Sequence, residues 1–359
     1  YEIASCLVGS EMCIRDRLGN IKNHVISYKK KETIKMAKVK TFKTIFPAVS
    51  VPLNDDYSIN EPEFRAYLRW IKTFYGKGMD GLVCNGHTGE ITGLTRAERK
   101  RVVEICAEEC GDVMTIISGV NCENTAESIE MAKEAKEAGA DGILLMPPHM
   151  WLRFGMNPDA PFEYVKDVAE GADIDIIIHL YPATSKAFYP VETLIKMCKE
   201  IDHVKCIKMG TRVTSIYEHD VRLLRQECPD ISLITCHDET LCVSWFPGMD
   251  GALIGFAGCV PEIICPAREV FANPDKHTLK EAQDWSDRIY HISQAIYGGG
   301  QPSGEAHARL KEALKQRGIF KSALMRKPVL PLNDEEKAWV ALGLERSQLP
   351  EVDMTQFED

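Results

Sequence analysis

Several features are missing from this sequence, and each absence excludes a class of protein. No apolar run approaches the roughly 18 residues that a membrane-spanning helix requires. The formal net charge is −10, and the only basic block is the short run 29–31, so neither a membrane nor nucleic acid is an expected partner. No Gly-x-Gly-x-x-Gly motif follows the first predicted strand, which disfavours a dinucleotide-binding fold.

The cysteines also lack a pattern. The 13 cysteines are scattered, without a Cys-x-x-Cys pair or the framework of a small disulfide-rich domain. We interpret them as reduced packing residues and predict a reducing, cytoplasmic location.

The first 35 residues differ from the rest of the chain. Residues 1–17 have no periodicity and no signal-peptide architecture, and they resemble a translated sequencing adapter. Residues 18–35 are rich in lysine, and ordered patterning begins just after Met36. We therefore predict that 1–35 is a non-native or disordered leader.

One structural unit recurs from Lys43 onward: a short apolar strand, a loop and an amphipathic helix. Eight such units, spaced by about 20 to 35 residues, predict a closed (β/α)8 TIM barrel over 36–275 rather than an open doubly wound sheet. Further helical patterns predict a C-terminal helical extension over 276–359, packed on the barrel. The predicted strands are 45–52, 81–85, 114–120, 143–146, 175–181, 204–209, 231–236 and 252–256.

Lys208 is unusual because it lies deep in the apolar sixth strand. Alternation places it on the same face as Cys206, whereas Lys205 is near enough to the strand start to reach solvent. Burying an ammonium group is costly, so such a lysine tends to lose its proton and become nucleophilic. This is what a Schiff-base lysine requires, although a long side chain that extends to the surface is the simpler alternative.

Polar residues gather where the predicted strands end, which is where a barrel of this kind places its active site. The Gly86–Gly89 turn has backbone N–H groups that could converge on a carboxylate, with the Thr88 hydroxyl beside them. Four of the ten histidines also fall at strand ends and suggest a rim that binds an anion or moves protons: His87, His149, His179 and His237.

Three segments together resemble one enzyme family. They are Gly-x-Thr-Gly-Glu at 86–90, Leu-Thr-x-x-Glu-Arg at 94–99 and Ile207-Lys208 in the sixth strand. With them, the sequence from about 43 to 349 resembles the dihydrodipicolinate synthase / N-acetylneuraminate lyase family.

The resemblance implies class I aldolase chemistry with no cofactor or metal. Lys208 would form a Schiff base with a 2-oxo acid such as pyruvate, and the resulting enamine would add to an aldehyde, or the reverse. Dehydration of a sugar-acid-like substrate is a related possibility. Gly86, His87 and Thr88 would hold the carboxylate, and Gly255 would line the site through its backbone. The family also implies a homotetramer or dimer.

Several family positions carry different residues here. His179 stands in place of the family's proton-relaying tyrosine, and Thr184 in place of the synthase's carboxylate-binding arginine. We predict that His179 is the acid/base, because the ordinary histidine pKa of about 6.5 is close to working pH. Tyr181 shares its face and is a possible substitute. The other predicted substrate-binding residues are His149 and His237.

Three alternatives remain open from the sequence. The first is 4-hydroxy-tetrahydrodipicolinate synthase itself. The second is a metal-dependent lyase or hydrolase that uses the four histidines with Asp238, although no His-x-His or Glu-x-x-His spacing supports it. The third is a non-catalytic protein that binds a 2-oxo acid. Borohydride trapping and metal analysis would separate these alternatives.

Overall fold

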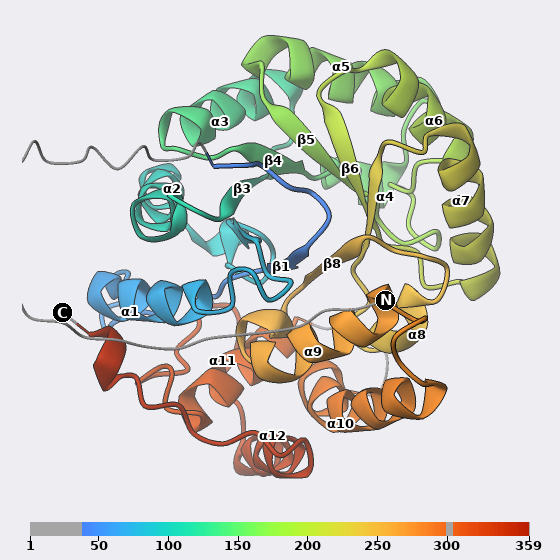
Figure 1. Cartoon of the computed structure of the whole chain (residues 1–359). Coiled ribbons are helices and arrows are strands. Elements are labelled where there is room, and N and C mark those ends of the chain that lie inside the picture. Colours follow the sequence, from blue (N-terminus) through green and yellow to red (C-terminus); the bar gives the residue numbers. More distant parts are fainter. Residues whose placement is uncertain (1–37, 299–303, 359) are drawn as a thin grey trace, which may run out of the picture. The chain divides into compact units, whose positions relative to one another are not determined.

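A computed structural model describes residues 38–298 and 304–358, so the predicted leader and its boundary at Met36 lie outside the described residues. Eight parallel strands form one sheet, with helices arranged around it (Figure 1). The strands are β1 (Ile45–Pro47), β2 (Gly81–Cys84), β3 (Thr115–Val120), β4 (Gly142–Leu145), β5 (Asp175–His179), β6 (Val204–Met209), β7 (Ser232–Thr235) and β8 (Gly251–Ile254).

The order of the strands closes the sheet into a barrel. Each strand pairs with the next along the chain from β2 to β8, and β8 pairs with β1. Between β1 and β2 there is a parallel bridge from Ala48 to Val83, and the Val49 N–H donates to the Val83 carbonyl at 2.9 Å. The predicted (β/α)8 barrel with a C-terminal helical part is confirmed.

The helices of the barrel follow the predicted pattern, and their local signals are visible in the sequence. Thr95 and Glu98 form a reciprocal capping box at the start of α2, as their spacing predicts. The helices that follow the strands are α1 (Glu61–Lys72), α2 (Arg96–Cys110), α3 (Thr125–Glu137), α4 (Met150–Phe154), α5 (Ala160–Ala172), α6 (Val191–Glu200), α7 (Thr214–Glu227), α8 (Leu241–Trp245) and α9 (Pro261–Ala272), with short 3-10 turns at Ile91–Gly93 and Phe256–Gly258.

Three elements differ from the prediction. Strand β1, predicted over 45–52, ends at Pro47, and beyond it Ala48 and Leu53 form only isolated bridges. Strand β5 ends at His179, two residues early, because Pro182 has no N–H to continue the ladder. The short helix α4 was not predicted. Its first N–H groups, on His149 and Met150, donate to the Glu123 carboxylate at 3.2 and 2.9 Å. This cap comes from a distant loop, so the local sequence gives no sign of it.

The barrel interior is a separate, fully buried cluster of apolar side chains. Cys206 of β6 belongs to it, so Lys208, two residues further along the same strand, faces the end of the barrel above this core. The cluster consists of Phe46, Ala48, Val83, Ile117, Leu144, Met146, Ile177, Cys206, Ile234 and Leu253.

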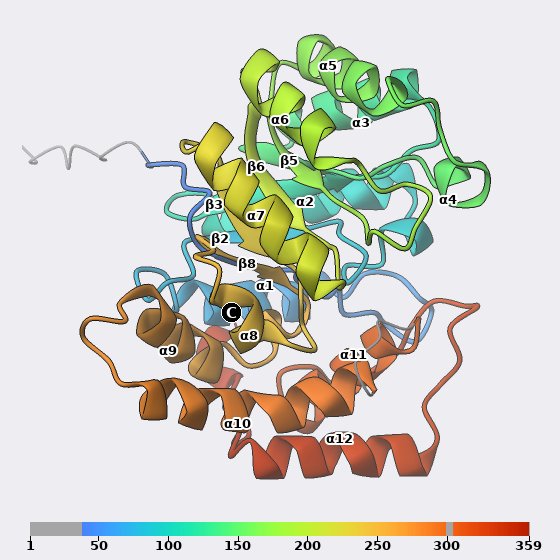
Figure 2. The same ribbon diagram turned by 90° about the vertical axis from the view of Figure 1, so that its right-hand side faces the viewer.

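Three C-terminal helices pack on one another and against the barrel helices (Figure 2). They are α10 (Leu279–Tyr297), α11 (Ala306–Gln316) and α12 (Asp334–Arg346), followed by a 3-10 turn at Thr355–Phe357. Helix α10 contacts α8 and α9, while α11 and α12 both pack against α10. No described helix has both the length and the hydropathy needed to cross a bilayer. The eleven cysteines of the described segments are all free thiols.

Candidate active site

A cavity of about 420 Å³ lies at the carboxyl ends of the strands. It contains most of the residues that the sequence singled out, because parallel strands deliver their ends to one face of the barrel. The predicted site residues that line it are Gly86, His87, Thr88, His149, His179, Tyr181, Lys208 and Gly255.

Lys208 is positioned by the pairing of β6 with β5, which sets it beside His179. Part of its surface faces the cavity, and it forms no salt bridge with any described residue. Burial lowers the pKa of the Lys208 amine, although Cys236 and Asp238 act in the opposite direction. The amine is therefore more easily deprotonated, and hence more nucleophilic, than that of an exposed lysine.

Lys311 is a second buried lysine, and its environment is different. Its ammonium forms an ion pair with Glu90 and donates to the Leu324 carbonyl at 2.9 Å. It does not line the cavity. Glu90 follows the Gly86–Gly89 turn with a φ of 56°, so this ion pair connects α11 to the turn and braces it.

A cluster of imidazole and phenol rings forms one wall of the cavity. The Tyr181 hydroxyl lies 3.3 Å from Nε2 of His87 and 3.4 Å from Nε2 of His149. The His179 ring centroid lies 5.5 Å from that of His87 and 5.0 Å from that of Tyr181. Among the described residues, Nδ1 of His179 has no hydrogen-bond partner.

The protonation states of this cluster differ from the expectation for free histidine. Burial, and then the charge of Lys208, lowers the pKa of His87 to about 3 and that of His179 well below its ordinary value. Burial raises the pKa of Tyr181 above its ordinary value. The expectation that His179 titrates near neutral pH is therefore wrong. At neutral pH the two histidines are neutral proton acceptors and the tyrosine is a proton donor.

Asp238 is a buried carboxyl group at the opposite side of the cavity. Its Oδ1 accepts the backbone N–H groups of Gly255 at 2.7 Å and Phe256 at 3.3 Å, and its carboxyl group also bonds to Tyr297. Burial raises the pKa of Asp238 to about 6, against the opposing effects of Tyr297 and Lys208. Asp238 and Lys208 interact electrostatically: Asp238 raises the pKa of the Lys208 amine, and Lys208 lowers the pKa of Asp238.

Gly255 leaves room for the hydroxyl groups of Tyr297 and Thr88 beside its backbone. A Cβ atom at this position would overlap the Tyr297 hydroxyl and lie 3.0 Å from Oγ1 of Thr88. Only glycine leaves both hydroxyl groups in place, so the end of β8 packs closely against the turn after β2.

Sequence reasoning missed three residues that line the cavity: Arg212, Tyr297 and His307. Arg212 comes just after β6, and its position four residues beyond Lys208 could have indicated that it lines the same cavity. Tyr297 and His307 come from α10 and α11, where helical periodicity gives no indication that they face an active site. Burial lowers the pKa of His307 to about 4, with Lys208 contributing.

Two residues predicted to bind substrate lie elsewhere. Thr184 is exposed on the turn that follows β5, where the Ser185 N–H donates to the Pro182 carbonyl at 2.8 Å. His237 points away from the cavity, because successive residues after β7 alternate and its neighbours Cys236 and Asp238 face Lys208.

The donor geometry gives no support to a metal site. Within 38–298 and 304–358, no group of three or more His, Cys, Asp or Glu side chains could hold a metal ion. Of the four rim histidines, three line the Lys208 cavity and His237 does not.

Replacing His307 with glutamine should reduce the acid sensitivity of the fold. An unfolded histidine gains a proton below pH 6.5, whereas folded His307 stays neutral until about pH 4, so stability is lost as pH falls through this window. Between pH 7 and 5 this one group accounts for about 2 kcal/mol. Urea unfolding should show His307→Gln losing about that much less than the wild type. An equal loss in both proteins would contradict the buried, neutral state, and His219→Gln, at an exposed position on α7, is the matched control.

A closed barrel with a lysine amine in the cavity at its carboxyl end, flanked by neutral proton acceptors and a buried carboxyl group, defines a lyase of the class I aldolase type. Comparison with known proteins is consistent with this class. Residues 41–346 match the model of the dihydrodipicolinate synthetase family, and the chain belongs to that family.

The curated relatives are distant in sequence, but the match to this chain covers nearly the whole length of each. The 4-hydroxy-tetrahydrodipicolinate synthase of Bartonella bacilliformis is 26% identical over 304 residues, which is 84% of this chain and 97% of that protein. An uncharacterized DapA-like lyase of Thermofilum pendens is 25% identical over 292 residues, 81% of this chain and 92% of its own.

Solved structures share the fold. A prophage protein of the dihydrodipicolinic acid synthase family from E. coli K12, solved in complex with pyruvate, has a TM-score of 0.76 at 21% identity, covering 86% of this chain and 99% of that one. A monomeric dihydrodipicolinate synthase variant has a TM-score of 0.75 at 19% identity, covering 86% and 97%.

Proposed function

We propose that Lys208 forms a Schiff base with a 2-oxo acid such as pyruvate, and that the protein makes or breaks a carbon–carbon bond to an aldehyde. Dehydration of a sugar-acid-like substrate through the same intermediate is the related reaction. The observation that carries the proposal is the Lys208 amine, which faces the cavity with a pKa lowered by burial and forms no salt bridge within 38–298 and 304–358. The pyruvate complex of the E. coli relative supports this choice of substrate.

The first step joins the amine to the ketone. The neutral Lys208 amine attacks C2 of the 2-oxo acid, and the carbonyl oxygen takes up a proton from the Tyr181 side of the cavity. This oxygen then leaves as water, so one amine, one ketone and one proton give an iminium ion and one water molecule. Asp238, when ionised, supplies the opposite charge that stabilises the iminium in a buried site.

The second step uses a neutral histidine as base. His179 removes a proton from C3. The electron pair of that C–H bond forms the C2–C3 double bond, and the π pair of the iminium moves to its nitrogen, which gives a neutral enamine. C3 then forms a bond with the aldehyde carbon, and the aldehyde oxygen takes the proton back. Hydrolysis by one water molecule releases the product and the Lys208 amine. The reverse order describes cleavage.

The turn after β2 is the candidate site for the carboxylate of the 2-oxo acid. The turn closes through its own carbonyl groups, which accept the N–H groups of Glu90 at 3.0 Å and Ile91 at 3.3 Å. The Thr88 hydroxyl lies beside Gly255 in the cavity wall. We propose that backbone N–H groups of residues 86–88 and this hydroxyl bind the carboxylate.

Among the described residues that line the cavity, few offer the second substrate an unpaired positive charge. Thr184 is exposed and brings no cation to the cavity, while the Arg212 guanidinium is already paired with Glu239 at 2.5 Å. We therefore propose an uncharged aldehyde rather than a second carboxylate at this end, which separates the protein from 4-hydroxy-tetrahydrodipicolinate synthase.

Reduction with borohydride tests the Schiff base directly. Incubation with pyruvate followed by borohydride should increase the intact mass by one reduced pyruvyl group and inactivate the protein irreversibly. Lactate has no ketone and should leave the mass unchanged. The absence of any adduct with pyruvate and a panel of other 2-oxo acids would contradict the proposal and favour a protein that only binds the acid.

A further inference from the structure

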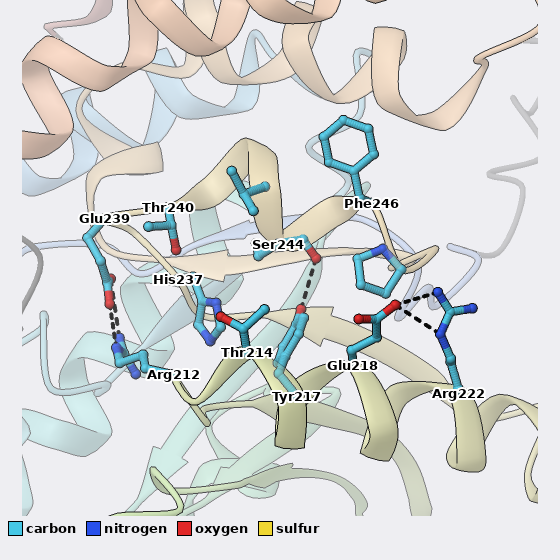
Figure 3. Close-up of a pocket in the computed structure, with 12 residues that line it drawn as sticks. Arg212, Thr214, Tyr217, Glu218, Arg222, His237, Glu239, Thr240, Ser244 and Phe246 are labelled. Carbon is cyan, nitrogen blue, oxygen red and sulfur yellow. Dashed lines mark hydrogen bonds and ion pairs between the residues drawn. The ribbon is translucent and has the colours of Figure 1, made fainter.

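The Lys208 cavity has little positive charge with which to bind a carboxylate. Among the described residues that line it, only Lys208 and Arg212 are a lysine or an arginine, and Lys208 reacts with the ketone. The Arg212 guanidinium points toward Glu239 and pairs with it at 2.5 Å, as Figure 3 shows, and its Nη1 donates to the Gly210 carbonyl at 2.9 Å. The carboxylate of a 2-oxo acid therefore depends on neutral hydrogen-bond donors.

His307 brings an uncommitted imidazole ring to this cavity. The ring forms no hydrogen bond with any described residue, whereas His87 and His149 both lie within hydrogen-bond distance of the Tyr181 hydroxyl. Nδ1 of His179 is an enclosed atom without a partner, but neither ring nitrogen of His307 is enclosed in this way within the described segments. Both nitrogens of His307 therefore keep accessible surface, and a ligand in the cavity can reach them.

Helix α11 places His307 beside the turn that follows β2. His307 and Lys311 are four residues apart, so they lie on the same face of the helix, about 6 Å apart along its axis. Lys311 forms its ion pair with Glu90, at the end of the turn, and this pair directs that face of the helix toward the turn. Ala306 lines the cavity as well, so the first residues of α11 border it on this side.

His307 is also close enough to Lys208 for their charges to interact. Burial, and then the charge of Lys208, lowers the pKa of His307 to about 4, and His307 contributes in turn to the lowered pKa of His87. At neutral pH the His307 ring is therefore uncharged, with one N–H to donate and one lone pair.

A position beside both Lys208 and the turn suits the carboxylate better than the aldehyde. In the Schiff base the carboxylate is attached to C2, the same carbon that is bonded to the Lys208 nitrogen. The oxygen that an aldehyde brings is attached to C4, two carbons farther along the substrate. A side chain that borders Lys208 and the turn after β2 therefore meets the carboxylate first.

We propose that His307 is a substrate-binding residue whose neutral ring donates a hydrogen bond to the carboxylate of the 2-oxo acid. It acts together with the Thr88 hydroxyl and the backbone N–H groups of the turn. The proposal rests on the Schiff-base function proposed above, because the Schiff base fixes the carboxylate next to Lys208. It gives His307 a role in binding the 2-oxo acid and none in the transfer of the C3 proton.

Exchange of the pyruvate methyl hydrogens with solvent deuterium, followed by proton NMR over a range of pyruvate concentrations, separates binding from proton transfer. His307→Phe keeps a ring but has no donor, so the half-saturating pyruvate concentration should rise about tenfold or more, as for a lost hydrogen bond to a charged group. The rate at saturation should stay within about threefold of the wild type, because only binding is lost. His307→Gln retains an N–H donor and should restore most of the affinity.

Two further variants separate a lost contact from a damaged fold. His307→Ala removes the donor without adding bulk and should raise the half-saturating pyruvate concentration as His307→Phe does. His219→Phe, at an exposed position on α7, should behave as the wild type. A loss of affinity in His307→Phe that His307→Gln fails to reverse would indicate a structural role and overturn the proposal.

Two competing 2-oxo acids distinguish the carboxylate from the other end of the substrate. 2-Oxopentanoate and 4-hydroxy-2-oxopentanoate differ only in the hydroxyl group at the position of the aldehyde oxygen. Both should inhibit the exchange, and His307→Phe should weaken both by the same factor as pyruvate. Weaker inhibition by the hydroxylated acid alone would assign His307 to the aldehyde, and an unchanged half-saturating pyruvate concentration would also overturn the proposal. The absence of exchange and of a borohydride adduct in the wild type would instead refute the Schiff-base function itself.

Discussion

Lys208→Ala is expected to eliminate the exchange of pyruvate methyl hydrogens with solvent deuterium. Exchange requires the enamine, and the enamine requires the amine, so the loss should be on the order of 10³-fold or more. Proton NMR of pyruvate in deuterated buffer measures the rate without knowledge of the second substrate. The same variant should give no adduct with borohydride.

Lys205→Ala is the matched control for this experiment. Lys205 lies on the same strand, three residues earlier, but its side chain is exposed. Its removal should leave the exchange rate within about twofold of the wild type, since surface substitutions rarely perturb the fold. Exchange that persists in Lys208→Ala would assign the chemistry to another group.

His179→Phe is expected to lower the exchange rate by about 10²- to 10⁴-fold, the usual contribution of a positioned acid or base. The phenyl ring retains the packing against His87 and Tyr181 but cannot accept a proton. Adduct formation with borohydride should be less affected, because iminium formation does not need the C3 proton. Comparing the exchange rate with the trapping rate therefore separates a role in proton transfer from a structural one.

Two variants define the alternatives to His179. His179→Tyr restores a group that can relay protons and should retain more activity than His179→Phe. His219→Phe, on the exposed face of α7, should behave as the wild type. Full exchange in His179→Phe together with loss in Tyr181→Phe would transfer the role to the tyrosine, whose hydroxyl lies 3.3 Å from His87.

The barrel was predictable because its signals are local and repeated. Each strand is a short apolar run, each helix has its own periodicity, and eight repetitions leave little choice of architecture. The position of Lys208 followed from strand alternation alone. The turn at 86–90 followed from its glycines and from the rule that parallel strands deliver their ends to one face.

The remaining parts of the site depend on tertiary contacts that no local pattern encodes. Tyr297 and His307 reach the cavity only because α10 and α11 pack against the barrel. Thr184 was predicted to bind substrate because it lies two residues after Pro182, at the position of the family's arginine, but after the early end of β5 it is exposed to solvent. The protonation of His179 depends on burial beside Lys208, which sequence spacing cannot measure.

The C-terminal segment contributes to the cavity and forms ion pairs with elements of the barrel. The ion pair between Lys311 and Glu90 connects α11 to the turn after β2, and Arg326, in the segment after α11, donates to the Glu98 carboxylate on α2. These links fix the turn that faces Lys208. They also explain why a helical extension contributes His307 to the same cavity.

Mapping of the trapped adduct tests the central claim most directly. The protein is incubated with isotopically labelled pyruvate, reduced with borohydride and digested, and the modified peptide is identified by mass spectrometry. We predict a single modified residue, Lys208. Modification of Lys311 or of a surface lysine instead, with Lys208 unmodified, would contradict the assignment of the Schiff base.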